Sequence, residues 1–151
     1  MNKITGTIIT LNNEAVIEDC IISLKKICNE IIVLDSLSSD NTVSIAKNLG
    51  AKIYEQEFLG DGPQKKLAAS YASNDWVFSL DSDERLEDDL IDFVQSLDLD
   101  TSPFRAYSFK RRNFCGSKWI KAASFYPDRV TRLFNKNYVN LNCFPTHFQQ
   151  T

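Results

Sequence analysis

The chain lacks the features that mark several common classes of protein. No apolar run approaches the roughly 18 residues that cross a bilayer, and the first residues do not resemble a signal peptide. There is no CxxC spacing, which disfavours a zinc site or a disulfide framework. We therefore expect a cytoplasmic protein with reduced, mostly packing thiols at Cys20, Cys28, Cys115 and Cys143.

Two phosphate-binding motifs rich in glycine are also missing. Neither GxGxxG nor GxxxxGK followed by Ser or Thr occurs, which disfavours ordinary dinucleotide and NTPase chemistry. No internal repeat divides the chain. With 151 residues, of which 43% are hydrophobic, the chain is long enough for one domain with a real core.

Acidic residues are absent from one long stretch of the chain. Residues 101–127 contain no Asp or Glu, whereas acids dominate residues 81–100. The acid-free stretch interleaves basic and aromatic side chains: Phe104, Arg105, Tyr107, Phe109, Lys110, Arg111, Arg112, Phe114, Lys118, Trp119, Lys121, Phe125 and Tyr126. It suits a partner that carries phosphate or lipid groups, or an anionic membrane surface, or it is a solvated face over an aromatic core. Single-stranded nucleic acid is a further alternative, but no RNA-binding motif accompanies the charge, so we expect no nucleic acid partner.

Strand and helix patterns alternate over the first hundred residues. The strand patterns cover residues 4–10, 31–34, 52–54 and 76–80. The helix patterns begin at Asn12 or Asn13, at Ser39 or Asp40, near Pro63, and at residue 86. This alternation predicts an α/β fold with a mainly parallel sheet and helices on both faces. Beyond residue 103, extended patterns at 107–109 and 130–134 lack clear crossover helices.

The most informative junction is WVFSLDSDE, residues 76–84, where an apolar run breaks into carboxylates. The run predicts a strand buried on both faces, whose end delivers Asp81 and Asp83 to the carboxyl edge of the sheet. Two carboxylates at such an edge can hold a divalent cation that also binds phosphate oxygens. The alternative is a polar turn, with Asp83 or Glu84 near a helix start.

Three other segments are expected at the same edge. Residues 10–14 follow the first strand, Asp35 follows the second, and residues 60–65 precede the third helix. Asp35 could accept a hydrogen bond from a base or ribose, and Lys65 could neutralise phosphate. Singly, Asp35 could cap a turn, Lys65 could be a solvated charge and Asn13 a helix cap. Jointly, these residues favour a diphosphate site that includes a metal.

Four segments then resemble, in order and spacing, family 2 glycosyltransferases with the GT-A fold. They are IITLNNE (8–14), IIVLDSLSSDNT (31–42), GPQK (62–65) and LDSDE (80–84). Later motifs are similar to the branch that builds bacterial lipopolysaccharide core: RRNF from Arg111, Gly116, Trp119, YPD ending at Asp128, and RLF from Arg132. The resemblance implies one GT-A domain over residues 1–151, with a shortened C-terminal part. Residues 1–100 would bind the nucleotide sugar, and residues 101–151 would form the acceptor-side segment.

The resemblance also implies an activity. A metal-dependent enzyme would move a hexose, glucose as the first candidate, from a UDP-sugar to a cell-envelope glycan such as lipopolysaccharide core. Transfer would invert the anomeric centre, and the enzyme could contact the cytoplasmic face of the inner membrane. The implied residues are Thr10, Asn12 and Glu14 lining the nucleotide pocket, Asp35 on the uracil, Lys65 near the nucleotide, and Asp81 and Asp83 holding Mg²⁺ or Mn²⁺, with Asp83 as the more direct ligand.

Three positions depart from the family pattern. Leu37 replaces a usual glycine, so the loop is expected to adopt a strained conformation less readily, and Lys66 replaces a usual asparagine. Near the end, His147 precedes Phe148 where the branch has His-Glu, so Asp128 becomes the fallback catalytic base; it could equally be a turn residue. His147 is expected to be a surface or structural histidine. The alternative function is therefore a donor-binding but catalytically incomplete GT-A module or fragment.

Overall fold

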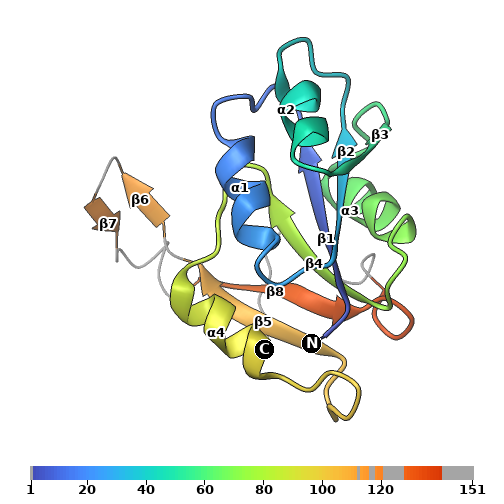
Figure 1. The fold of residues 1–151 in the computed structure, drawn as a ribbon, viewed down its shortest axis with the longest axis vertical. Helices are drawn as coiled ribbons and strands as arrows, with labels where there is room; N and C mark the ends of the chain where they lie inside the picture. Colours follow the sequence, from blue (N-terminus) through green and yellow to red (C-terminus); the bar gives the residue numbers. More distant parts are fainter. Residues whose placement is uncertain (1, 112, 116–117, 121–127, 141–151) are drawn as a thin grey trace.

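The computed structural model describes residues 2–111, 113–115, 118–120 and 128–140. The elements are β1 (Ile4–Thr10), α1 (Ile17–Leu24), β2 (Glu30–Asp35), α2 (Thr42–Asn48), β3 (Lys52–Glu55), α3 (Asp61–Ser70), β4 (Trp76–Asp81), α4 (Asp88–Ser96), β5 (Ala106–Arg111), β6 (Asn113–Cys115), β7 (Lys118–Ile120) and β8 (Asp128–Asn135). Six strands form one sheet in the order β3-β2-β1-β4-β8-β5 (Figure 1). The strands β6 and β7 form a separate antiparallel pair.

The predicted α/β fold with a mainly parallel sheet is confirmed. The strands β3, β2, β1 and β4 pair in parallel, because each is followed by a helix that returns the chain to the opposite end of the sheet. The strand β8 runs antiparallel to both β4 and β5. The strands β5 and β8 therefore extend the same sheet and do not form a second one.

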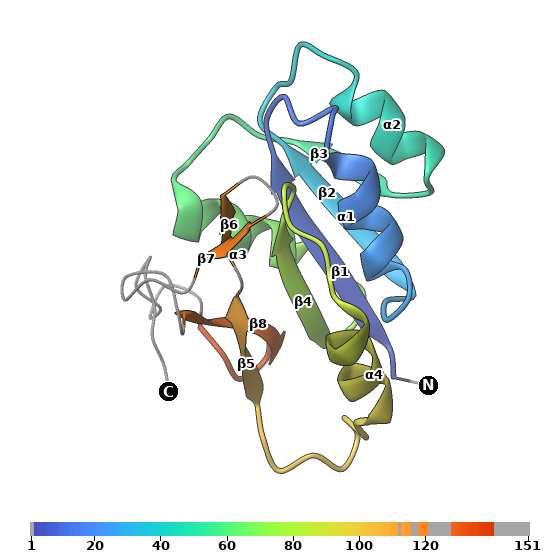
Figure 2. The same ribbon diagram turned by 90° about the vertical axis from the view of Figure 1, so that its left-hand side faces the viewer.

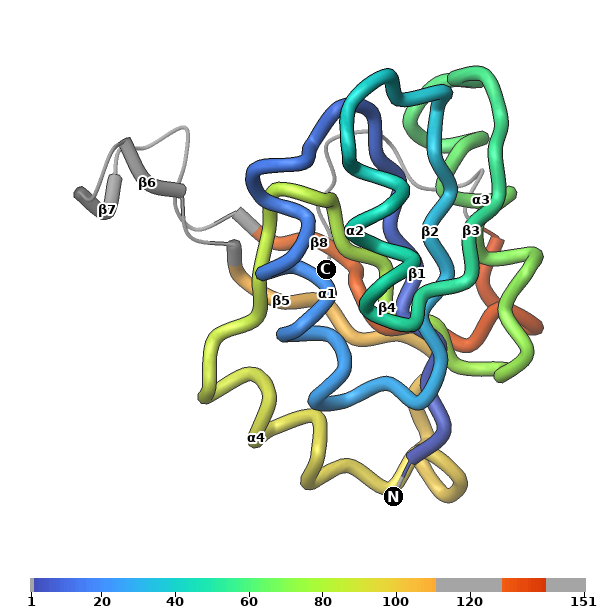
Figure 3. Tube along the Cα trace, turned by 45° about the horizontal axis from the view of Figure 1, so that its top comes forward, coloured from blue at the N-terminus to red at the C-terminus, as the bar shows by residue number. Residues whose placement is uncertain are grey.

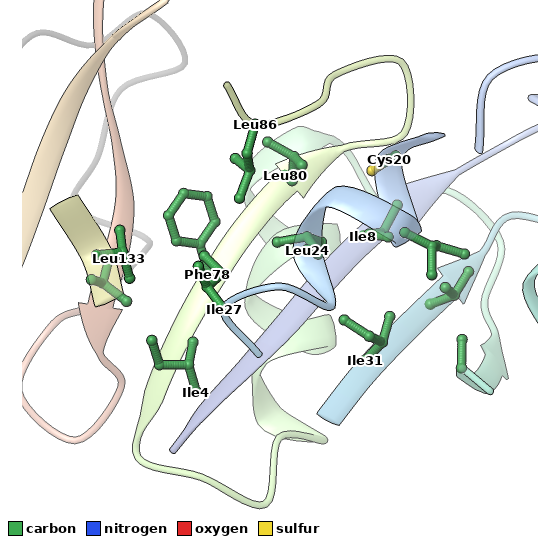
Figure 4. Packing of buried hydrophobic residues seen from close by; sticks show 14 of the residues in the cluster. Ile4, Ile8, Cys20, Leu24, Ile27, Ile31, Phe78, Leu80, Leu86 and Leu133 are labelled. Atoms are coloured by element: carbon green, nitrogen blue, oxygen red, sulfur yellow. The ribbon is translucent and has the colours of Figure 1, made fainter. Parts of the chain in front are cut away.

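Helices cover both faces of the sheet, as predicted. The helices α1, α2 and α4 lie on one face and α3 lies on the other (Figure 2). On the first face, Leu24 of α1 packs with Ile8 and Phe78 of the sheet (Figure 4). Gly6 lies beneath this contact, and a Cβ there would be only 3.2 Å from Leu24 Cδ1. The missing side chain thus lets α1 approach β1 closely.

The first helix starts later than the sequence predicts. It begins at Ile17 after Val16, and no side chain caps it. The prediction that Asn12 or Asn13 caps this helix is wrong, because the Asn13 side chain serves the neighbouring loops instead. The Asn13 carbonyl, however, accepts the backbone N–H of both Val16 and Ile17.

The second helix also starts later, at Thr42 after Asn41, and not at Ser39 or Asp40. Asp40 still supports it, because its carboxylate accepts the Thr42 N–H at 2.9 Å and the Thr42 hydroxyl. These bonds, the hydroxyl first, lower the pKa of Asp40. The remaining predicted strands and helices agree with the structure within a few residues at their ends.

Two cysteines, Cys20 and Cys28, are free thiols. Cys20 and Cys28 form no disulfide and pack in or against the core between α1 and the sheet. Burial raises the pKa of both thiols, and the carboxylates of the nearby Asp81–Glu84 turn add to the effect at Cys20. Within the described ranges, no helix has the length and apolarity that a membrane span needs.

Candidate functional site

The carboxyl ends of β1, β2 and β4 meet at one edge of the sheet, at its upper end in Figure 1. The parallel register places Thr10 opposite Asp35 and Ile9 opposite Asp81. The N-terminal turns of α3 reach the same edge, since Lys65 contacts Asp81. The structure therefore brings together the strand ends that the sequence predicts to converge.

Lys65 lies between two carboxylates at this edge. Its Nζ is 3.2 Å from Asp61 Oδ2 and 3.4 Å from Asp81 Oδ1. The Lys65 side chain is 22% exposed and the Asp81 side chain 33%, so both groups are open enough to reach a ligand. The pair stands beside the position where an anionic ligand could bind both a lysine and a carboxylate-held cation.

The turn after β4 is held by hydrogen bonds, and its tip is exposed to solvent. Ser82 is buried and donates to Asn13 Oδ1 at 2.6 Å. Glu84 accepts the Asp81 N–H at 2.9 Å, while the Asp81 carbonyl accepts the Glu84 N–H at 3.0 Å. Asp83 is exposed at the tip of the turn. The helix α4 begins beyond this turn, so the acidic residues do not start it.

An arginine from the far strand completes the turn. Arg132 of β8 is buried, and its guanidinium donates to Glu84 Oε2 at 2.6 Å and to the Ser79 carbonyl at 3.4 Å. The sequence interpretation assigned no role to this arginine or to Glu84 in the site. A signal was present, because a charged residue that is followed by Leu133 and Phe134 in a strand must find a partner if it is buried.

Asp35 is fully buried at the end of β2. Its carboxylate accepts both the N–H of Ser38, at 2.8 Å, and the Ser38 hydroxyl. Asp35 thus closes a turn, which is the structural alternative that the sequence left open. Its contact with a uracil stays a prediction. Thr10 is also buried, and its hydroxyl donates to Asn13 Oδ1 at 2.8 Å.

The loops after β1 and β2 lie side by side (Figure 3) and are joined by hydrogen bonds. The Asn12 side chain accepts the Ser39 N–H at 2.8 Å, and the Glu14 carboxylate accepts the Asn41 N–H at 2.9 Å. In return, the Glu14 N–H donates to Asp40 at 3.3 Å. These contacts give Asn12 and Glu14 a structural role, and their contact with a nucleotide remains a prediction.

Leu37 lies in the loop after β2 and adopts the strained conformation there. Its backbone has a φ of 68°, in the left-handed region. The expectation was that leucine adopts such a conformation less readily than glycine, and the structure shows that leucine does not prevent it. The hydrogen bonds of Ser38 to Asp35 on one side, and of Ser36 to Thr10 on the other, hold the backbone there despite the steric cost.

Gln64 is a further residue whose role the sequence did not indicate. Although it belongs to the α3 segment next to Lys65, its side chain is fully buried. Its Oε1 accepts the Leu59 N–H at 3.0 Å, and its Nε2 donates to Ser36 Oγ at 3.2 Å and to the Gln56 carbonyl at 3.3 Å. Gln64 thereby fixes the start of α3, and with it Lys65, against the end of β2.

The donor set at the edge suits a hard divalent cation. Among the described residues, no three His, Cys, Asp or Glu side chains form a ready-made metal cluster. Asp81 and Asp83 offer carboxylate oxygens from one turn. Mg²⁺ is usually held by one or two protein carboxylates together with substrate phosphates, and Mn²⁺ also prefers oxygen ligands. The residues present therefore fit a cation shared with a diphosphate.

Several predicted residues lie outside the described part of the chain. Asp128 begins β8 by its backbone, but its side chain is outside the described residues. The same holds for His147, for Cys143, and for all side chains of the basic and aromatic stretch between residues 111 and 127. Their expected roles stay predictions.

The chain is similar in sequence to several bacterial proteins named as glycosyltransferases. An uncharacterised glycosyltransferase of Rickettsia typhi is 40% identical over 144 residues, which cover 93% of this chain and 49% of that protein. The lipopolysaccharide core biosynthesis glycosyltransferase LpsC of Rhizobium meliloti is 32% identical over 99 residues, covering 62% of this chain and 36% of that protein. The chain spans about half the length of the Rickettsia relatives that it matches.

The chain also resembles a solved structure in its fold, and its sequence matches the model of a protein family. The crystal structure of TarS from S. aureus matches with a TM-score of 0.54 at 24% identity, over 63% of this chain and 32% of that one. This likeness concerns the fold alone. The sequence model of glycosyl transferase family 2 matches residues 7–149, which is nearly the entire sequence. The chain therefore belongs to glycosyl transferase family 2.

Proposed function

We propose that this chain carries an inverting, metal-dependent hexosyltransferase activity that uses a UDP-sugar as donor. The observation that carries the proposal is the edge of the sheet where Lys65, Asp81 and Asp83 stand together in a family 2 chain. Glucose is the first candidate for the hexose. The proposed acceptor is a cell-envelope glycan such as lipopolysaccharide core, which is supported by the partial likeness to LpsC.

On the donor side, Asp81 and Asp83 would hold Mg²⁺ or Mn²⁺. When bound, such a cation neutralises the negative charge that grows on a departing diphosphate. Lys65, already 3.4 Å from Asp81, would donate to a phosphate oxygen on the same side. The loop residues Thr10, Asn12, Glu14 and Asp35 would form the nucleotide end of the pocket.

On the acceptor side, a hydroxyl attacks the anomeric carbon and a carboxylate takes its proton. Asp128 remains the proposed base. The transition state of such a transfer has oxocarbenium character. A nearby carboxylate would therefore also stabilise the positive charge that develops on the sugar ring. The start of β8 joins the same sheet as the donor residues, which supports a single domain with a donor half, residues 1–100, and an acceptor-side segment, residues 101–151.

Basic and aromatic residues support an acceptor with phosphate or lipid groups. In the described part of this segment, the Arg105 guanidinium lies 3.9 Å above the Tyr138 ring, and Phe104 is 60% exposed. Such groups suit phosphorylated or lipid-linked glycans and a peripheral contact with the cytoplasmic face of the inner membrane. No nucleic acid partner is proposed.

A second candidate is donor binding without turnover. It is favoured by the coverage of the relatives, since this chain matches only 49% of the Rickettsia typhi protein. Residues that act on the acceptor in such relatives could then belong to the unmatched half. The two candidates share the donor site and differ only in the chemical step.

Thermal shift with Mn²⁺ and a panel of UDP- and GDP-sugars identifies the donor, because a ligand raises the melting temperature only if it binds the folded chain. UDP release is then measured with the donor that gives the largest shift. Stabilisation by a UDP-sugar followed by acceptor-dependent UDP release supports the transferase. Stabilisation without release supports the second candidate, and a shift by GDP-sugars alone contradicts both.

A further inference from the structure

The strand β8 contains a bulge at Arg132. In its ladder with β5, Tyr107 pairs with Leu133 and the next residue, Ser108, pairs with Thr131. Arg132 is therefore the extra residue, with no partner on β5. It has none on β4 either, because that ladder ends at the pair Phe78 and Leu133. Bulges redirect a side chain and increase the local twist, and they are frequent beside active sites.

The ladder between β4 and β8 ends before β4 does. Its last pair involves Phe78, whereas β4 continues to Asp81 and stays paired with β1 on its other side. On the side facing β8, side chains replace strand pairing. Arg132 donates to the Ser79 carbonyl at 3.4 Å, and Glu84 accepts the Asp81 N–H at 2.9 Å. The last residues of β4 thus depend on these two side chains to satisfy their backbone groups.

The two side chains also hold each other. Arg132 donates to Glu84 Oε2 at 2.6 Å, and the Glu84 side chain is 18% exposed against 7% for Arg132. A buried arginine that lost this partner would be left with uncompensated charge. Glu84 would lose the contact that orients its second oxygen toward the Asp81 N–H. A continuous chain of hydrogen bonds therefore runs from the bulge to the first acidic residue of the turn.

We infer that Arg132 is a positioning residue for the divalent-cation site, and that it acts through Glu84 on Asp81. The inference rests on the proposed function. Arg132 pairs with Glu84 and keeps that carboxylate turned to the protein, so that Asp81 and Asp83 face the ligand side. Hydrogen-bond partners that orient a metal ligand typically alter metal affinity by about 10- to 100-fold when they are removed.

The test separates cation binding from folding and from nucleotide binding. Calorimetry on the 151-residue chain gives the Mn²⁺ affinity at saturating UDP, and the UDP affinity both in Mn²⁺ and in EDTA. Urea unfolding is followed on the same samples. The variants are Arg132→Met, Glu84→Gln and the double variant. Arg132→Lys keeps the charge but not the two-pronged geometry. Arg129→Lys is the matched control, because it makes the same exchange at an exposed position of the same strand.

We expect Arg132→Met and Glu84→Gln each to lower the Mn²⁺ affinity about 10- to 100-fold. Their UDP affinity in EDTA should equal that of the parent chain. The double variant should be no weaker than the weaker single variant, because both act along one path. Arg132→Lys should fall between Arg132→Met and the parent chain, and Arg129→Lys should match the parent.

Two results overturn the inference while leaving the proposed function intact. One is a folded Arg132→Met chain with the parent Mn²⁺ affinity; if that variant does not fold, an unchanged affinity in Arg132→Lys has the same meaning. The other is an equal loss of UDP affinity with Mn²⁺ and with EDTA, which indicates a general distortion. A parent chain that binds UDP no better with Mn²⁺ than with EDTA overturns the metal site itself, and the inference with it.

Discussion

Lys65 and Asp81 form an ion pair, with 3.4 Å between Nζ and Oδ1, at the end of β4. Lys65 belongs to the helix α3 and Asp81 ends the strand β4, and Gln64 fixes the helix turn that carries the lysine. Lys65 thus has two tasks in the proposed function. It balances the carboxylate charge of the free protein, and it donates to a phosphate once the donor binds.

Replacing Lys65 tests the second task. We expect Lys65→Met to weaken UDP binding in Mn²⁺ by about 10-fold, the loss of one charge-assisted hydrogen bond. Lys66→Met is the matched control, because Lys66 is the next residue of the same helix and is exposed. Calorimetric titration of UDP into each variant measures the effect. Equal affinity in the two variants would place Lys65 outside the nucleotide site.

Leu37 should be a site where glycine stabilises the fold. Its φ of 68° is costly for leucine and free of strain for glycine. Because the Leu37 side chain is 54% exposed, little apolar burial is lost on substitution. We expect Leu37→Gly to raise the free energy of unfolding by about 0.5–1 kcal/mol, measured by urea denaturation.

The matched control for Leu37 is Leu59, which is 50% exposed and is not among the described residues with positive φ. Leu59→Gly should lower the free energy of unfolding, since it only adds freedom to the unfolded chain. Opposite signs at the two leucines support strain at Leu37. The same sign at both would show that the backbone at Leu37 relaxes without cost.

Glu30 makes the free energy of unfolding depend on pH in the acid range. Burial raises its pKa, but hydrogen bonds from Lys52, Thr5 and Ser73 outweigh burial and lower the pKa to about 2, from 4.5. A group with a depressed folded-state pKa stabilises the protein above its unfolded pKa. That contribution is lost as pH falls from about 4.5 toward 2.

The Glu30 contribution should be about 1–2 kcal/mol, after allowance for solvent screening at the exposed Lys52. Glu30→Gln should therefore reduce the free energy of unfolding at pH 7 by that amount and flatten its dependence on pH below 4.5. Urea denaturation between pH 2.5 and 7 measures both. Glu57→Gln, at an exposed position in the loop before α3, should leave the pH profile unchanged.

The frame of the fold could be predicted from the sequence because it follows from periodicity. The apolar run at 76–80 became β4, and the strand patterns at 31–34 and 4–10 became β2 and β1. The ends of these strands converge as parallel pairing requires. The helix starts were less predictable. Asparagine is a residue type that often caps helices. The Asn13 side chain instead accepts hydrogen bonds from Thr10 and Ser82, and Ser82 is 69 residues away in sequence.

The supports of the candidate site could not be predicted, because they depend on tertiary packing. Glu84 and Arg132 are 48 residues apart in sequence. The bulge in β8 directs the arginine side chain toward the loop that follows β4. Such a bulge breaks the period-two pattern of a strand and leaves no clear trace in the sequence. Likewise, nothing in the sequence indicates that the Gln64 side chain is buried and accepts and donates backbone hydrogen bonds.

The most direct test of the account is the affinity of the 151-residue chain for UDP in Mn²⁺ and in EDTA, with Asp83→Asn and the exposed control Asp92→Asn. We expect Mn²⁺ to strengthen UDP binding by at least about 10-fold in the parent chain and in Asp92→Asn, because a bound cation joins carboxylate to diphosphate. Asp83→Asn should lose most of that gain. The same gain in Asp83→Asn as in the parent chain, or none in the parent chain, would contradict a diphosphate-metal site at the end of β4.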